Sequence, residues 1–268
     1  MQIYFHLFGH SIPAYGLLIV LGVITANLLG AVIIRRYRLD FNDFIILEAY
    51  AFLGGFLGAK VLYLAVSFQD IDWSRILEPS YFNSLMQGGF VFYGGLIGGI
   101  AAVLCASRLH KIPCSPYLRH CIFLIPLIHC FGRVGCFFAG CCYGIPWDGL
   151  FSVTFPQGSL APAGVPLFPV QLAEAFCLLA LSLLLRYLDT VLTHFYAVET
   201  YLISYGIIRF VLEFFRDDSA RGKLLFLSTS QWISLLLTGC CLYLLKRRAG
   251  QSKAAPKPPA QSGTSQTP

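Results

Sequence analysis

The chain has 268 residues, of which 57% are hydrophobic and 12% charged, with a formal net charge of +6. Soluble domains carry about 25% charged residues, so this composition excludes an ordinary water-soluble globule. The positive charge does not indicate a nucleic-acid binder, because most charges lie in short clusters between apolar runs. The first eleven residues contain no Lys or Arg, and we expect no cleavable signal peptide.

Seven apolar segments are each long enough to cross a bilayer, which takes roughly 17–25 helical residues. Backbone polar groups in hydrocarbon must be satisfied internally, and the continuous runs favour helices over the alternating strands of a barrel. The sequence therefore predicts an all-α polytopic membrane protein. The predicted spans cover about 12–34, 44–67, 88–107, 118–140, 169–188, 196–215 and 229–245.

Basic residues gather in alternate loops. The loops after the first and third spans and the segment after the seventh are the richest in Arg and Lys. By the positive-inside rule, this bias predicts an N-terminus outside and a C-terminus in the cytoplasm, as an odd number of spans requires. We expect residues 1–248 to form one transmembrane domain and the Pro-, Ala- and Ser-rich tail 249–268 to be disordered.

Small residues recur four positions apart in the second and third spans. Gly54 with Gly58, and Gly94 with Gly98, each share one helix face, which lets helix backbones approach closely. Helix packing is the main role that this pattern predicts. No internal repeat is found.

Five charged residues within the predicted spans are candidates for charges at membrane depth: Lys60, Arg133, Glu174, Arg209 and Glu213. Each costs about 2.5–3.5 kcal/mol on the insertion scale, so each needs a reason. The predicted topology places all five in the outer half of the bilayer, near Tyr15 and Tyr93. They form either ion pairs that only fix helix registers or an electropositive pocket. The second alternative rests on Arg133 and Arg209, because arginine binds phosphate oxygens bidentately. Arg209 and Glu213 are four apart and could pair along their helix.

Five motifs follow one another in order through the first six spans. They are Tyr15-Gly16-Leu17, Gly94-Gly95-Leu96-Ile97-Gly98, Gly132-Arg133-Val134-Gly135 with Gly144, Pro169-Val170-Gln171-Leu172-Ala173-Glu174, and Tyr205-Gly206 through Arg209 to Arg216. In this order, over about residues 12–218, they resemble the prolipoprotein diacylglyceryl transferase family. Any one of these motifs alone would be a weak signal.

The resemblance implies a seven-helix enzyme of the bacterial cytoplasmic (inner) membrane. It would transfer the diacylglyceryl group of phosphatidylglycerol, or of a similar anionic phospholipid, to the cysteine thiol beside a prolipoprotein signal peptide. Arg133 and Arg209 match the family's functional arginines, expected to hold the phosphate and stabilise the departing glycerol phosphate. The expected substrate-binding residues are Tyr15, Arg133, Gly94, Gly95, Gly144, Glu174 and Glu213. No metal or organic cofactor is expected, since positioned cations can supply the electrostatic stabilisation.

The sequence departs from the family pattern where chemistry is expected. Tyr93 stands in place of a histidine, Cys136 in place of an asparagine, Cys141 in place of a later glutamate, and Phe168 in place of another histidine. Tyr93 and Cys136 are the expected catalytic residues beside the two arginines, although a tyrosine is a weak base at neutral pH. His129, one turn before Arg133, is either a replacement base or a satisfied polar core residue.

Three cysteines, Cys136, Cys141 and Cys142, lie close in sequence to Arg133. Four interpretations stay open: simple packing, a thiolate nucleophile, a disulfide, or a metal site with His129 that no CxxC spacing supports. Two other functions are open as well. One is a related membrane transferase with a different acceptor or a Cys136-linked intermediate, and the other is a non-catalytic lipid-binding or transport protein.

Overall fold

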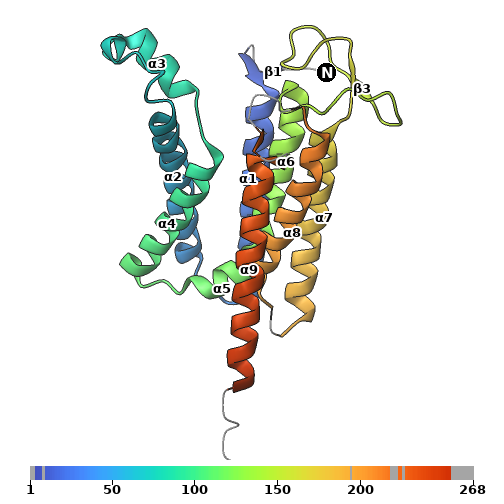
Figure 1. Cartoon of the computed structure of the whole chain (residues 1–268). Helices are drawn as coiled ribbons and strands as arrows, with labels where there is room; N and C mark the ends of the chain where they lie inside the picture. The colour runs from blue at the N-terminus through green and yellow to red at the C-terminus, as the bar shows by residue number, and fades with distance from the viewer. Residues whose placement is uncertain (1–3, 8–9, 194, 218–222, 225–226, 255–268) are drawn as a thin grey trace, which may run out of the picture. The chain divides into compact units, whose positions relative to one another are not determined.

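The computed structural model describes residues 4–7, 10–193, 195–217, 223–224 and 227–254, and most of them are helical (Figure 1). The chain divides into two compact units. One is formed within 1–23 and 125–268, and the other is formed by 24–124. Helix α1 (Ala14–Arg36) contributes its first part to one unit and its second part to the other.

The unit of residues 24–124 is built on two helices that pack closely together, α2 (Phe41–Val66) and α4 (Phe92–His110). A Cβ on Gly58 would lie 2.3 Å from the carbonyl oxygen of Gly94, and one on Gly54 would lie 2.5 Å from that of Gly98. The backbones can approach this closely only because glycines face each other, so the packing role predicted for these residues is confirmed. The unit also holds a 3-10 turn (Trp73–Arg75) and the shorter helices α3 (Pro79–Gln87) and α5 (Cys114–Cys121).

Lys60, on α2, is buried within this unit by contacts that the sequence did not predict. Its ammonium group donates hydrogen bonds to the carbonyl oxygens of Leu85 and, at 2.6 Å, of Gly88. These carbonyls lie at the end of α3, where a helix leaves its acceptors unsatisfied. These local contacts account for the burial of Lys60, which pairs with no carboxylate among the residues that the structure describes.

Besides the first part of α1, the other unit contains further helices that lie side by side in Figure 1. They are α6 (Leu124–Ala139), α7 (Val170–Val191), α8 (Ala197–Leu212) and α9 (Thr229–Ala254). A 3-10 turn, Glu213–Phe215, continues α8. The connection from α6 to α7 folds around Phe155, Ala161 and Leu167, which are buried together. This folded connection holds the end of α6 next to the start of α7.

Within the described residues, short strands that the all-α prediction did not include pair in three antiparallel sheets. The pairs are β1 (Tyr4–Leu7) with β2 (His10–Pro13), β3 (Val153–Thr154) with β4 (Pro166–Leu167), and β5 (Lys223–Leu224) with β6 (Leu227–Ser228). Each has at most four residues, so periodicity along the sequence could not reveal them.

Every predicted span overlaps a helix, but the predicted boundaries need two corrections. Within the described residues, three helices are long and apolar enough to cross a membrane (α1, α2 and α7), and α5 with α6 adds a fourth if the bent pair is one span. This pair bends by 49°, so the continuous helix predicted over 118–140 is wrong. Pro126, in the first turn of α6, has no N–H to donate and fits best where a helix begins.

The second correction concerns the C-terminal tail. Helix α9 continues to Ala254, so residues 249–254 are helical and not disordered. Ala, Lys and Gln have favourable helix propensities, which lets the apolar helix extend into this polar segment. The rest of the predicted tail, 255–268, lies outside the described residues.

Candidate active site

Two arginines from different helices share one buried carboxylate. Nη2 of Arg133, on α6, lies 3.0 Å from Oε1 of Glu174 on α7. Nη1 of Arg209, on α8, lies 3.8 Å from Oε2 of the same side chain. Glu174 is only 1% exposed, so both ion pairs are shielded from solvent. The sequence prediction that these charges from separate helices come together is confirmed for these three residues.

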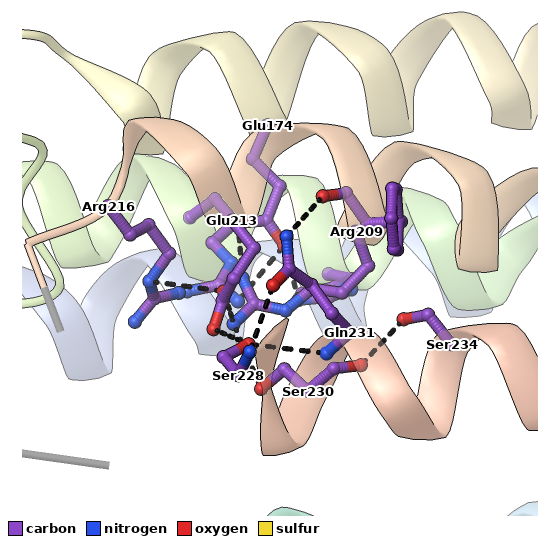
Figure 2. A network of polar contacts seen from close by, with 11 residues as sticks. Glu174, Arg209, Glu213, Arg216, Ser228, Ser230, Gln231 and Ser234 are labelled. Carbon is purple, nitrogen blue, oxygen red and sulfur yellow. Dashed lines mark hydrogen bonds and ion pairs between the residues drawn. The ribbon is translucent and has the colours of Figure 1, made fainter. Parts of the chain in front are cut away.

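The network continues from Arg209 through Glu213 (Figure 2). The expected pair along α8 is present, with Nη2 of Arg209 2.5 Å from Oε2 of Glu213. Nε of Arg216 lies 4.0 Å from the same oxygen, and the hydroxyl of Ser228 donates a hydrogen bond to Oε1 at 2.8 Å. Glu213 therefore joins two arginines to the start of α9.

The first turns of α9 supply the polar wall of this network. Ser228 accepts a hydrogen bond from the backbone N–H of Gln231 at 3.2 Å, and Gln231 Oε1 accepts one from the backbone N–H of Ser228 at 2.9 Å. This reciprocal pair is a capping box, which fixes where the helix begins. Ser230 accepts a hydrogen bond of 3.5 Å from Nη2 of Arg209, so the cap also helps to orient that guanidinium.

The network carries more positive than negative charge. Arg133, Arg209 and Arg216 face the carboxylates of Glu174 and Glu213, which leaves a formal charge of +1 on these five residues. In addition, Nε of Arg133, Nη1 of Arg209 and Nε of Arg216 are buried with no hydrogen-bond partner in the described part of the chain, as are Oε1 of Glu174 and Oε2 of Glu213. A buried guanidinium donor without an acceptor is costly, so the nitrogens of Arg133 and Arg209 are suited to bind an anion.

Tyr15 and Gly144 lie against the ends of the helices that carry the network. A Cβ on Gly135 would lie 3.1 Å from the ring of Tyr15, so the first turn of α1 packs directly on α6. A Cβ on Gly144 would lie 2.3 Å from the carbonyl oxygen of Phe168 and 2.7 Å from that of Phe215. Gly144 thus allows three connecting segments to converge, and its expected contact with a substrate stays a prediction.

Tyr93, Gly94 and Gly95 lie on α4, in the unit of residues 24–124. Gly94 is buried against the backbone of Gly58 and the side chain of Leu62. For these glycines the structure shows the contact with α2. Their expected role toward a substrate, and that of Tyr93 as a base, stay predictions.

His129 lies beside the ion-pair network, one turn before Arg133. Its Nε2 is 3.9 Å from Oε1 of Glu174, and its ring centroid is 5.5 Å from that of Tyr205. The histidine therefore lies next to the carboxylate that the two arginines share, and its position also fits a packed polar residue. Both interpretations from the sequence stay open.

The three clustered cysteines are brought together by the turn that follows α6. Their sulfur atoms lie within 4.8 Å of one another, and all three thiols are free, so the structure does not support the disulfide interpretation. In the loop after α6, hydrogen bonds from the thiols of Cys136 and Cys141 hold the pKa of the Cys142 thiol below its ordinary value. The positive charges of Arg216 and Arg133 act in the same direction.

Sequence reasoning missed several residues of this site. It named Arg216 only as the last residue of the fifth motif and gave it no role, but the residue is only 8% exposed and belongs to the network. It also overlooked Ser228, Ser230 and Gln231. A signal for them was present, because Ser-x-x-Gln before an apolar run is the pattern of a capping box.

Comparisons with known proteins point to one family. Residues 2–246 match the family model described as "Prolipoprotein diacylglyceryl transferase". A Clostridium perfringens (strain 13 / Type A) protein named "Phosphatidylglycerol--prolipoprotein diacylglyceryl transferase 2" is 35% identical over 257 residues, 94% of this chain and 97% of that protein. Two proteins named "Phosphatidylglycerol--prolipoprotein diacylglyceryl transferase" are also similar. The one from Clostridium tetani (strain Massachusetts / E88) is 34% identical over 86% of this chain and 91% of its own length. The one from Idiomarina loihiensis (strain ATCC BAA-735 / DSM 15497 / L2-TR) is 31% identical, over 92% of each chain.

Proposed function

The chain belongs to the prolipoprotein diacylglyceryl transferase family, and from this premise we propose that it is a transferase of lipoprotein maturation. It transfers the diacylglyceryl group of phosphatidylglycerol to the thiol of a cysteine in a prolipoprotein. The curated relatives are named for this reaction, and the similarity extends through both units of the chain.

One observation carries the assignment of roles. Arg133 and Arg209 come from separate helices and share Glu174, and each has a buried guanidinium nitrogen with no hydrogen-bond partner among the described residues. A phosphodiester carries one negative charge and several acceptor oxygens, which match this site in sign and in geometry. In the proposal, these two guanidiniums bind the lipid phosphate, while Glu174 and Glu213 hold them in place.

The same geometry explains how the site would accelerate the reaction. When the thiolate sulfur attacks the glycerol carbon, a C–S bond forms and the C–O bond to the phosphate breaks. The electron pair leaves with glycerol phosphate, so negative charge at the phosphate increases in the transition state. Fixed cations bind the transition state more strongly than the substrate, and this difference lowers the barrier.

The remaining expected residues keep their proposed roles. Tyr93 and Cys136 stand at the positions where the family pattern has polar groups, and we assign them to the handling of the acceptor thiol. Tyr15, Gly94, Gly95 and Gly144 are proposed to contact the lipid. The side chain of Tyr15, on α1, packs against α6 at Gly135, two residues after Arg133, which supports its place among the residues that contact the lipid.

The chain is a membrane protein with several apolar helices. We propose that seven spans cross the bacterial cytoplasmic membrane, formed by α1, α2, α4, the bent pair of α5 and α6, α7, α8 and α9. The N-terminus is outside in this arrangement, as the basic loops require. Residues 1–248 then form the transferase domain.

Complementation of a bacterium depleted of its own diacylglyceryl transferase tests this function. The expected result is growth, together with a diacylglyceryl mass shift on the N-terminal cysteine peptide of a lipoprotein. Arg133→Ala and Arg209→Ala should insert but give no shift, whereas Arg186→Ala, which removes a pair at the other end of α7, should retain it. Absence of the mass shift with the wild-type chain, expressed and inserted, would contradict the proposal.

A further inference from the structure

The cysteine cluster is held by main-chain contacts that do not depend on the thiols. Gly140 has φ +70° and Cys142 has φ +57°, so the chain reverses sharply after α6. The backbone N–H of Cys141 donates to the carbonyl oxygen of Cys136 at 3.1 Å. Nε2 of Gln171, on α7, donates to the carbonyl oxygen of Cys141 at 2.9 Å. These contacts preorganise three sulfur atoms on one side of a tight turn.

The spacing of the three sulfurs fits a single thiophilic cation. A zinc–sulfur bond is about 2.3 Å, so two thiolates on one tetrahedral zinc lie about 3.8 Å apart. The sulfurs of Cys136, Cys141 and Cys142 all lie within 4.8 Å of one another, so small rotations of the side chains would suffice. Thiolate ligands favour zinc over magnesium or calcium, which prefer oxygen.

The surroundings of the cluster favour the resulting charge. Three thiolates with one Zn²⁺ carry a net charge of −1, and two arginines flank this turn: Arg133 lies three residues before Cys136 on α6, and the backbone of Arg216 pairs with Gly144, two residues after Cys142. Cys136 is buried, whereas Cys141 and Cys142 are partly exposed. The cluster is therefore shielded at Cys136 and partly accessible at Cys141 and Cys142.

We propose that Cys136, Cys141 and Cys142 bind a zinc ion through three thiolates, and that the fourth coordination position takes the acceptor thiol. The second part of this proposal rests on the proposed function. Catalytic zinc sites keep such an open position, and a thiol that coordinates zinc is deprotonated. The acceptor thiol releases its proton to solvent on binding, and its sulfur then attacks the glycerol carbon as described above. No oxidant or reductant is needed.

Cobalt binding tests the metal site without any substrate. Purified full-length protein in detergent, reduced and freed of metal, is titrated with Co²⁺, whose thiolate complexes absorb through charge-transfer bands in the near ultraviolet. The expected result is one Co²⁺ per chain, displaced by Zn²⁺. Cys136→Ser and Cys141→Ser should weaken binding at least about 100-fold, while Cys130→Ser, elsewhere on α6, should leave it unchanged. Absence of thiolate bands, or equal binding by the cluster variants, would overturn the proposal.

A second measurement uses only the wild-type chain, so it does not depend on the folding of any variant. The protein is treated with a maleimide with and without Zn²⁺, and each labelled cysteine is located by mass spectrometry. Zn²⁺ should protect Cys136, Cys141 and Cys142 and leave the labelling of Cys130 unchanged. Equal labelling of the three with and without Zn²⁺ would refute the site.

Two further results separate the metal site from the proposed function. A prolipoprotein peptide with Cys as the acceptor residue should shift the spectrum of the cobalt-loaded protein, and the same peptide with Ser should not. Absence of a shift with the Cys peptide would refute the proposal that the acceptor thiol takes the fourth coordination position. Zinc binding in a chain that fails complementation would leave the metal site standing and remove the transferase function. Full transfer by the metal-free protein would remove the role of zinc and leave the function standing.

Discussion

Replacing Glu174 by glutamine keeps the shape of the side chain and removes the charge that Arg133 and Arg209 share. The two ion pairs measure 3.0 and 3.8 Å, and at an effective dielectric constant of about 20 they correspond to about 5.5 and 4.4 kcal/mol of attraction. Burial of the charges offsets much of this attraction. The net loss expected when one partner of a buried pair is removed is about 3–5 kcal/mol.

The expected loss has two measurable consequences. The midpoint of thermal unfolding in detergent should fall by roughly 6–20 °C, because one kcal/mol corresponds to roughly 2–4 °C in a chain of this size. At a temperature where the variant is folded, kcat should fall at least about tenfold, because the guanidiniums lose the carboxylate that orients them. KM for phosphatidylglycerol should not rise, since the site becomes more positive.

Asp189→Asn is the matched control on the same helix. Asp189 is buried and pairs with Arg186 at 2.9 Å, near the opposite end of α7 from Glu174. Its replacement should also lower the unfolding midpoint but leave kcat unchanged in the folded protein. If both variants lowered kcat equally, or if Glu174→Gln kept the wild-type rate, Glu174 would have no positioning role.

Three further predictions concern packing and capping. Gly144→Ala should lower the unfolding midpoint, because overpacking costs about 1–3 kcal/mol. Gly132→Ala, whose Cβ meets no atom within 4 Å, is the control and should leave the midpoint unchanged. Equal midpoints for the two variants would refute the convergence of segments at Gly144. Ser228→Ala should cost about 0.5–2 kcal/mol of stability in denaturant titrations, because α9 loses its N-terminal cap. It should also lower activity, because Glu213 loses a hydrogen bond. Unchanged stability and unchanged activity would show that the cap is not needed. Lys60→Met should destabilise the chain in thermal melts by at least about 1.5–3 kcal/mol, the contribution of one charged hydrogen bond, since Lys60 loses its hydrogen bonds to the carbonyls of Leu85 and Gly88; a neutral effect would contradict their importance.

The sequence predicted the helices and the central charges because both leave strong one-dimensional signals. Apolar runs mark helices in lipid, and a charge such as Glu174 inside such a run is costly enough to require a partner. The pairing of Arg209 with Glu213 followed from their spacing of four, which places them on one helix face. The close packing of Gly58 on Gly94 followed from small residues at the same spacing.

The remaining features depend on contacts between distant segments, which composition and periodicity do not encode. The partners of Lys60 are backbone carbonyls, and any residue type can supply these. Burial of Arg216 depends on a turn that folds back toward Glu213 and on Gly144 beside it. The bend before α6 was in principle predictable from Pro126, but the apolar run concealed it.

The most direct test of the account measures the affinity of purified protein for two lipids, phosphatidylglycerol and a diacylglycerol with the same acyl chains and no phosphate. Arg133→Gln and Arg209→Gln should each weaken phosphatidylglycerol binding about 10–150-fold and leave diacylglycerol binding unchanged. This loss of affinity corresponds to one charged hydrogen bond of about 1.5–3 kcal/mol. Unchanged affinity for phosphatidylglycerol, or an equal loss for both lipids, would contradict the claim that these two arginines hold the phosphate.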